Sequence, residues 1–388
     1  MPSPYVKPLP HDLMVDDGSS FVDSVSDTDL VYFLLNVGDG DCQFILLPLD
    51  AKTKRRQAIV VDIASFRKLD GLLGVLETTD LFSEQVAATS EPFTVVVGTH
   101  PHADHIAGMP QFLDRYGDLI GEYWDSGYYH TSSGYQRTMT ALEDHNGARL
   151  AVVQPTSGAV RFIGQVKLTV LTPAIGLKNS YDTYGIDLNN SSISLKLEFP
   201  ASRVVQRDKD RSLFKTRTQS LILGADAQTV SWGRAMADFP ELRPSDSPVA
   251  EAMGRAQGSY PLQADVFKVP HHGSKHGLNL ELVETIKPAI SLISSVSGAG
   301  KYNFPHLLSL ESIREARNAI AGSVDGEHKP DHELGIHLTG GEDDQGNPLG
   351  SVALVMSSTS NKRSLWRFYD PPDTDIDLAN ARRFQSTP

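Results

Sequence analysis

The sequence predicts one mixed α/β domain. Segments with strand-like and helix-like patterns alternate along most of the chain, and no linker rich in Pro, Gly or Ser divides it. The chain has 388 residues, of which 40% are hydrophobic and 21% are charged. This composition is ordinary for a globular protein and provides enough apolar side chains for a substantial core.

The first hundred residues contain four predicted strands. Apolar and β-branched runs place them at residues 29–36, 43–49, 57–63 and 93–97. The first two are expected to pair across a Gly-Asp-Gly-Asp turn. Leucine spacing predicts a helix over residues 66–76, and apolar residues at helical intervals predict another over residues 106–116.

The rest of the chain continues the alternation. Further strand or helix signals cover residues 134–145, 166–172, 192–199, 220–223, 266–269, 289–295, 351–357 and 364–369. The domain is therefore expected to span residues 29–370, with an N-terminal arm at 1–28 and a C-terminal tail at 371–388, each either flexible or packed on the domain.

Two segments are predicted to be insertions. Residues 203–217 are basic and polar, which favours a solvated hairpin or loop over a binding arm. Residues 322–350 are rich in Gly, Asp and Pro and are expected to be irregular, with a short strand candidate at 335–338.

Composition also bounds the class of protein. No apolar run approaches the ~20 residues of a membrane-spanning helix, and residues 1–28 are polar and acidic, so a cytoplasmic location is expected. The net charge of −13 argues mildly against a broad nucleic-acid-binding surface. The single cysteine, Cys42, allows no intrachain disulfide and is expected to be a small buried residue rather than a nucleophile.

The richest chemistry lies directly after the predicted strand at 93–97. There the chain reads Thr-His-Pro-His-Ala-Asp-His, from Thr99 to His105. His100 and His102 can point at one ion, while Asp104 and His105 turn toward a second position about 3.5–4 Å away, the usual separation in two-metal sites. Imidazole and carboxylate ligands without cysteine suit zinc, manganese or iron and argue against a closed structural zinc site.

This pattern resembles the metallo-β-lactamase superfamily. His100, His102, Asp104 and His105 match its HxHxDH signature, and Asp62 stands where the superfamily has an acidic residue ending an early strand. Two later segments also match: Asp226 corresponds to the carboxylate that bridges both metals, and His271 or His272 to the late histidine. The resemblance implies an αββα sandwich with a dinuclear site at the edge of its two sheets.

Within that superfamily the chain looks most similar to the ComEC-type branch, which implies nuclease or phosphodiesterase chemistry. Four segments carry this finer resemblance: residues 36–41 (Asn-Val-Gly-Asp-Gly-Asp), 189–192 (Asn-Asn-Ser-Ser), 269–274 (Val-Pro-His-His-Gly-Ser) and 302–306 (Tyr-Asn-Phe-Pro-His). In the last segment, Phe304 replaces a histidine of the branch pattern.

The resemblance implies two divalent metal ions, expected to be Zn²⁺ with Mn²⁺ as the alternative. The expected metal ligands are His100, His102, Asp104, His105, Asp226 and His271. A further histidine found in many superfamily hydrolases is missing, since this chain has Asn189 and Asn190 in that region; the first ion would then keep His100, His102 and Asp226. His130 and His145 are not expected to be ligands.

Three residues are expected to act in catalysis. Asp104 is expected to position the attacking water, and Asp62 to orient a histidine, with a strand-end cap as its alternative role. Adjacent residues leaving a strand tend to face opposite ways, so one of His271 and His272 should bind metal. We favour His271 as the ligand, with His272 orienting a loop or touching substrate.

Four further residues are candidates for holding an anionic substrate. They are Ser274, Lys275, His306 and Asn190. For Lys275, an ordinary surface lysine is the alternative.

Together these features predict a metal-dependent hydrolase that uses a metal-bridging hydroxide. The expected substrate is a phosphodiester; the alternative is a lactone, β-lactam or other small ester or amide. Two other classes are weaker fits. A non-catalytic binding module is disfavoured by the full ligand set, and a diiron redox protein lacks a flavin domain. The oligomeric state is left open.

Overall fold

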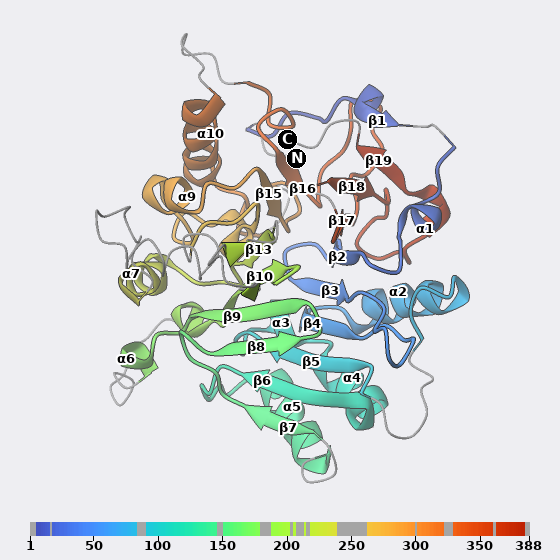
Figure 1. Cartoon of the computed structure of the whole chain (residues 1–388). Coiled ribbons are helices and arrows are strands. Elements are labelled where there is room, and N and C mark those ends of the chain that lie inside the picture. The colour runs from blue at the N-terminus through green and yellow to red at the C-terminus, as the bar shows by residue number, and fades with distance from the viewer. Residues whose placement is uncertain are drawn as a thin grey trace.

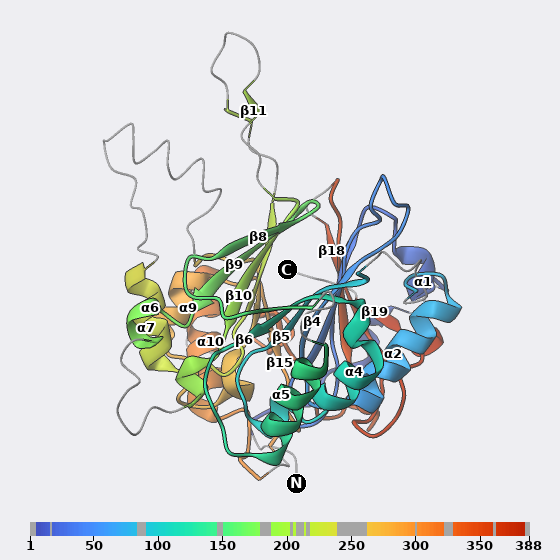
Figure 2. The same cartoon turned by 90° about the horizontal axis from the view of Figure 1, so that it is seen from below.

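The structure is a computed structural model. It describes residues 5–15, 18–83, 91–145, 150–178, 188–201, 205–206, 213–214, 218–238, 262–298, 301–321, 329–359 and 362–384. Two large sheets face each other, and helices cover both outer faces (Figures 1 and 2). The predicted αββα sandwich is confirmed.

The first sheet has ten strands in the order β1-β19-β18-β17-β2-β3-β4-β5-β6-β7. Its strands are β1 (Met14–Val15), β2 (Leu30–Leu34), β3 (Cys42–Leu46), β4 (Ala58–Ile63), β5 (Phe93–Gly98), β6 (Ile120–Asp125), β7 (Ala151–Val153), β17 (Val352–Met356), β18 (Arg363–Arg367) and β19 (Arg382–Phe384). β4 to β7 run parallel, and the remaining pairs are antiparallel. β1 and β19 come from the predicted arm and tail and extend this sheet.

The second sheet has seven strands in the order β16-β15-β14-β13-β10-β9-β8. They are β8 (Val160–Ile163), β9 (Val166–Thr172), β10 (Ser194–Phe199), β13 (Gln219–Leu223), β14 (Val266–Lys268), β15 (Ile290–Ile293) and β16 (Ile336–Leu338). β13 to β16 run parallel. A separate antiparallel pair, β11 (Val205–Gln206) and β12 (Leu213–Phe214), lies within the predicted basic insertion.

Helices pack on the outside of each sheet because each presents one apolar face. The helices on the first sheet are α1 (Phe21–Ser24), α2 (Phe66–Thr78), α3 (Ala103–Ile106), α4 (Met109–Tyr116) and α5 (Ser133–His145). The helices on the second sheet are α6 (Ile175–Lys178), α7 (Thr229–Asp238), α9 (Leu280–Ile286) and α10 (Leu307–Ala321). Three buried apolar clusters result, one between the sheets and one under each helical layer.

The helix predicted over residues 106–116 is divided in two. Gly108 lies between α3 and α4, and its amide donates to the carbonyl of Ile63 at 2.7 Å. A Cβ at this position would lie 2.4 Å from the Phe66 nitrogen, so a glycine is required for the backbones to pack this closely. The spacing of apolar residues predicts one continuous helix because it contains no information about this tertiary contact.

Several elements were not predicted from the sequence. They include β6, β7, β8, α7, α9 and α10. Residues 322–328, part of the expected insertion, lie outside the described residues, whereas β16 coincides with the strand candidate at 335–338. Among the described residues, no helix is both long and apolar enough to cross a membrane.

Candidate metal centre

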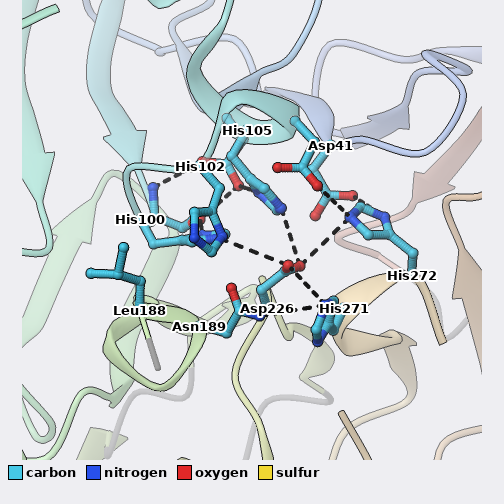
Figure 3. Close-up of polar contacts among 12 residues, drawn as sticks. Asp41, His100, His102, His105, Leu188, Asn189, Asp226, His271 and His272 are labelled. Carbon is cyan, nitrogen blue, oxygen red and sulfur yellow. Dashed lines mark hydrogen bonds and ion pairs between the residues drawn. The ribbon is translucent and has the colours of Figure 1, made fainter. Parts of the chain in front are cut away.

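The candidate site lies where parallel strands of both sheets end. Asp62 lies near the end of β4, and the Thr99–His105 loop follows β5. Asp226 follows β13, and His271 and His272 follow β14 in a 3₁₀ turn, η4 (Pro270–Gly273). Because these strand ends meet at one edge of the sandwich, side chains far apart in the sequence converge on one point (Figure 3).

Asp226 occupies the centre of this convergence. Its Oδ1 lies 3.1 Å from His105 Nε2 and 3.7 Å from His272 Nε2. Its Oδ2 lies 3.8 Å from His100 Nε2 and 3.7 Å from His271 Nε2. Each carboxylate oxygen therefore faces its own pair of histidines (Figure 3).

We name the two halves of the site after these oxygens. The Oδ1 group is Asp104, His105 and His272; Asp104 Oδ2 lies 3.9 Å from His272 Nε2. The Oδ2 group is His100, His102 and His271; His102 Nδ1 lies 3.0 Å from His100 Nε2. Both groups share Asp226.

Asp62 fixes the orientation of histidines in both groups. Its carboxylate accepts from the Thr99 amide and hydroxyl, each at 2.8 Å, and from His105 Nδ1 at 2.7 Å. Because the Thr99 hydroxyl donates to Asp62, it can accept from His100 Nδ1, 3.2 Å away. His100 and His105 thus have their Nδ1 protons engaged, which leaves each Nε2 lone pair facing Asp226.

A buried network does the same for His272. Its Nδ1 donates to the Ser294 carbonyl at 3.0 Å, and the Ser294 hydroxyl donates to Asp41. Asp41 in turn forms an ion pair with Lys268, and both side chains are fully buried. This network links the end of β14 to the loop before β3 and holds the His272 ring with Nε2 toward Asp226.

The Gly-Asp-Gly-Asp segment (residues 38–41) also holds the Thr99–His105 loop in place. The Asp41 amide donates to the Asp104 carbonyl at 2.9 Å. A Cβ on Gly40 would lie 2.8 Å from that same oxygen, so only glycine allows this approach. The turn predicted between two strands is therefore also a support for Asp104.

The titratable side chains at the centre of the site are buried, and their neighbours shift their pKa values. Burial disfavours charge on Asp226, yet His105 and His272 hold the pKa of its carboxyl well below the usual range. Burial also opposes charge on His105, but Asp226 and Asp62 raise the pKa of His105 well above its ordinary value. For His100, burial and then the neighbouring His105 lower the pKa well below normal.

The unpaired atoms of the site fit a metal ion. His105 Nε2, His272 Nε2 and Asp226 Oδ1 are buried and make no hydrogen bond among the described residues. Asp104, His105, Asp226 and His272 each offer a ligand atom within 4.8 Å of the others. Buried polar atoms are normally satisfied, so this convergence of lone pairs is what a divalent cation would complete.

A second acidic cluster, Asp41, Asp62 and His105, also lies within that distance. Its carboxylates already accept from Thr99, Ser294 and the Lys268 ammonium, so we assign it a supporting role.

His271 and His272 both face Asp226, whereas the sequence analysis expected them to point in opposite directions. Both have left-handed backbone angles, with φ of 51° and 53°. The alternation of an extended strand does not apply to such a turn. His271 is also near two amides: Asn189 Nδ2 lies 3.4 Å from its Nε2 and Gln228 Nε2 lies 3.5 Å from its Nδ1.

A pocket of about 370 Å³ opens over this centre. It is lined by His102, Ala103, Asp104, Asn189, Asp226, His271, Tyr302 and Phe304. The rings of Tyr302 and Phe304 are stacked, with centroids 5.6 Å apart, and Lys301 Nζ lies 4.8 Å from the Tyr302 ring centroid. The pocket therefore joins the candidate metal-binding side chains to an aromatic wall.

The four candidate substrate contacts do not line this pocket. Asn190 is buried and accepts from the Ser231 amide at 3.2 Å. Ser274 is buried in the turn after η4, where its hydroxyl accepts from the His276 amide at 3.4 Å. His306 Nδ1 accepts from the Lys275 amide at 3.1 Å, and its Nε2 donates to the Tyr302 carbonyl at 3.1 Å. The polar groups of Asn190, Ser274 and His306 are thus engaged within the protein, and the expected substrate contacts of these residues and of Lys275 stay predictions.

The sequence does not predict the supporting role of two residues of the site. Asp41 is expected in a turn and in the 36–41 segment of the family resemblance, and Lys268 in a strand; the structure pairs them beside His272. His130 is not expected to be a ligand; its ring lies beside that of His102, with centroids 5.8 Å apart. His145, by contrast, pairs with Asp118 at 3.1 Å at the end of α5.

Comparison with protein families agrees with this geometry. Residues 56–178 match the model of the Metallo-beta-lactamase superfamily. The match contains Asp62 and the whole Thr99–His105 loop, so this segment is similar to that superfamily. No curated protein gives a significant match to the chain.

Solved structures resemble the chain at low sequence identity. Igni18, a metallo hydrolase from Ignicoccus hospitalis, has 12% identity and a TM-score of 0.37, with 84% of this chain and 98% of that one covered. The metallo-beta-lactamase fold protein YhfI from Bacillus subtilis has 10% identity and a TM-score of 0.34, with coverages of 69% and 86%.

CmlA, a diiron beta-hydroxylase from Streptomyces venezuelae, has 11% identity and a TM-score of 0.37, with 81% of this chain covered. This chain spans about half of CmlA, 53% of its length. We draw no inference about activity from similarities at these TM-scores.

Proposed function

We propose that this chain is a metal-dependent hydrolase of the metallo-β-lactamase superfamily that holds two divalent ions on either side of Asp226. The proposal rests on the position of the two Asp226 carboxylate oxygens. One oxygen faces His105 and His272. The other faces His100 and His271. A carboxylate placed between two sets of imidazoles is suited to bridging two ions.

The proposed ligand sets follow the two groups. The Oδ1 group would hold one ion through Asp104, His105, His272 and Asp226. The Oδ2 group would hold the other through His100, His102, His271 and Asp226. His271 thereby takes the place of the superfamily histidine that the sequence lacks, and His272, rather than His271, serves the position beside Asp104.

When bound, two such ions supply Lewis-acid activation of water and neutralise charge that develops on the substrate. The protein's own side chains prepare the site. Asp62 holds His100 and His105 in their ligand tautomers, and the Asp41–Ser294 network does so for His272. Asp104 has a side chain 39% exposed and lines the pocket, so it can accept a proton from a water that attacks there.

The proposed substrate is a phosphodiester. Two features support this choice over a lactone or β-lactam. The resemblance to the ComEC-type branch implies it, and the Tyr302 and Phe304 rings line the pocket, with the Lys301 ammonium 4.8 Å from the Tyr302 ring centroid. An aromatic face beside a cation suits an aryl or nucleobase ester of phosphate.

The test combines metal content with hydrolysis. The wild type, reconstituted with Zn²⁺ or Mn²⁺, is assayed with bis(p-nitrophenyl) phosphate and with a panel of lactones and β-lactams. An Asp104→Ala, His105→Ala double variant removes two proposed ligands. His145→Gln serves as the control, because His145 pairs only with the exposed Asp118 in the described structure.

We expect roughly two ions per chain and phosphodiester hydrolysis in the wild type and the control. The double variant should lose hydrolysis and the ion of the Oδ1 group. Two ions with hydrolysis confined to lactones or β-lactams would refute the substrate. Failure to bind metal after reconstitution would refute the hydrolase itself.

A further inference from the structure

Arg367, on β18, is a buried cation with no acidic partner among the described residues. Its side chain is 1% exposed. Its Nη1 donates to the Leu338 carbonyl at 2.8 Å, which ties β18 to β16, but its Nε has no acceptor. Burial lowers the pKa of Arg367 to about 10, so the guanidinium stays charged at neutral pH. An isolated buried charge is costly unless an opposite charge meets it.

Two neighbouring polar groups also lack hydrogen-bond partners. Both ring nitrogens of His337, on β16, are buried without a partner, and so is the hydroxyl of Tyr369. Burial, followed by the charge of Arg367, lowers the pKa of His337 well below its ordinary value. His337 is therefore neutral and adds no second buried charge. Neither His337 nor Tyr369 lines the cavity described below, so among these three residues Arg367 is the one that can meet a ligand there.

Arg367 lines a cavity of about 470 Å³. The cavity is lined by residues of both β16 and β18, which the Arg367–Leu338 hydrogen bond joins. These two strands lie near each other in Figure 1. Leu9, Ile336, Leu338 and Leu349 give it an apolar wall. None of its lining residues lines the pocket over Asp226, so it is a separate site.

The other charged groups of the cavity leave it positive. Asp331 is a lining acid, and it is bound by Arg314 through two contacts of 2.7 and 2.8 Å. Lys7 and Lys329 are exposed at the rim. The carboxylate of Asp331 is thus already compensated, while Arg367 is not.

We propose that this cavity binds an organic anion, with its acidic group on Arg367 and its apolar body against the leucine and isoleucine side chains. The volume suits a small molecule, and a guanidinium at the wall of an apolar cavity gives orientation and specificity. Carboxylates and phosphate monoesters share the required chemistry. The site would bind its ligand independently of the metal centre.

Isothermal titration calorimetry tests the proposal with octanoate, hexyl phosphate, inorganic phosphate and octanol as probes. Four proteins are compared: the wild type, Arg367→Met, Asp226→Asn and Arg161→Met. Asp226→Asn disables the proposed metal centre, which could itself attract anions. Arg161→Met removes a half-exposed arginine that pairs with Glu122 at 2.8 Å and controls for loss of charge.

We expect octanoate or hexyl phosphate to bind one to one to the wild type, Asp226→Asn and Arg161→Met, and at least roughly tenfold more weakly to Arg367→Met. Tighter binding of octanoate would identify the natural ligand as a carboxylate, and tighter binding of hexyl phosphate would identify it as a phosphate monoester. Octanol lacks the acidic group and inorganic phosphate lacks the apolar body. Each should therefore bind to the wild type at least roughly tenfold more weakly than the organic anion does.

Three results would overturn the proposal: no saturable binding of either organic anion, equal affinity in Arg367→Met, or loss of binding in Asp226→Asn. If Arg367→Met does not fold, Lys329→Met replaces it, because that side chain is exposed. A roughly threefold lower affinity of Lys329→Met for the organic anion, relative to the wild type, would support the site. An unchanged affinity would contradict it.

Discussion

The two groups around Asp226 differ in how firmly the protein holds them. In the Oδ1 group, His105 donates to the Asp62 carboxylate at 2.7 Å, and His272 donates to a carbonyl that Asp41 and Lys268 support. In the Oδ2 group, His100 Nδ1 faces the Thr99 hydroxyl, and the two ring nitrogens of His271 lie 3.4 and 3.5 Å from side-chain amides. A hydrogen-bond partner on the ring nitrogen that does not bind metal orients a histidine and raises its basicity. We therefore expect the Oδ1 group to bind metal more tightly than the Oδ2 group.

The late histidines of the two groups also differ in exposure. His105 and His272 are fully buried, whereas the His271 side chain is 17% exposed and lines the pocket. His100 of the Oδ2 group is fully buried as well, and Asp104 of the Oδ1 group is 39% exposed and lines the pocket, so both groups reach the space available to substrate. We infer that the Oδ1 group anchors metal and that the Oδ2 group is the more exchangeable position.

The largest effect is expected from Asp226→Asn, which removes the carboxylate that both groups share. Loss of several kcal/mol of transition-state stabilisation should lower kcat/KM for bis(p-nitrophenyl) phosphate by roughly 10³-fold. Metal content, measured by elemental analysis after dialysis, should fall in the same variant. Retention of two tightly held ions would show that Asp226 does not bridge the groups.

The next largest effect is on stability. Lys268→Met leaves Asp41 buried without its cation and should cost about 3–5 kcal/mol in the free energy of unfolding, measured with urea. Lys167→Met is the matched control: its partner Glu198 is at 2.8 Å, but Lys167 is 25% exposed. We expect the control to change stability by about 1 kcal/mol or less. Equal effects would mean that the Asp41–Lys268 pair has no special part in supporting the Oδ1 group.

A smaller effect is expected when Asp62 loses its charge. Asn tolerates the left-handed backbone of Asp62, which has φ of 58°, so Asp62→Asn tests the carboxylate rather than the fold. Changes to such supporting partners typically cost 10–100-fold, so we expect roughly that loss in metal affinity. Asp118→Asn, at the exposed Asp118–His145 pair, should leave affinity unchanged. Unchanged affinity in Asp62→Asn would reduce Asp62 to a strand-end cap.

The smallest effect concerns the open side of the pocket. Tyr302 is 52% exposed and stacks on Phe304, so Tyr302→Ala should fold normally. Loss of one aromatic contact, about 0.5–1.5 kcal/mol, predicts roughly a two- to tenfold fall in kcat/KM for the aryl phosphodiester. Tyr129→Ala, which alters an exposed tyrosine outside the pocket, should have no effect. Equal activities of the two variants would remove Tyr302 from substrate recognition.

The sequence predicted the parts of this molecule that local pattern determines. The buried strands around β4 and β5 and the histidine-rich loop between β5 and α4 follow from apolar periodicity and residue type. Asp226 and the His271–His272 pair could be found only through a family resemblance, because no local pattern marks their proximity to His105.

The supporting residues escaped prediction for a different reason. Asp41 and Lys268 lie 227 positions apart, and only the sandwich brings them together. The left-handed turn at His271 and His272 is likewise set by packing after β14, so an argument from strand alternation gave the wrong expectation of opposed side chains. His306 was chosen for its residue type, but the fold uses both of its ring nitrogens to bind backbone atoms.

The most direct test of the two-group arrangement is a Zn²⁺ titration against a competing chelator for the wild type, His271→Ala and His272→Ala. We predict two steps of different affinity in the wild type. His271→Ala should keep the tighter step and weaken the other, whereas His272→Ala should lose the tighter step. A single step in the wild type, or loss of the tighter step in His271→Ala, would contradict the division of metal ligands about Asp226.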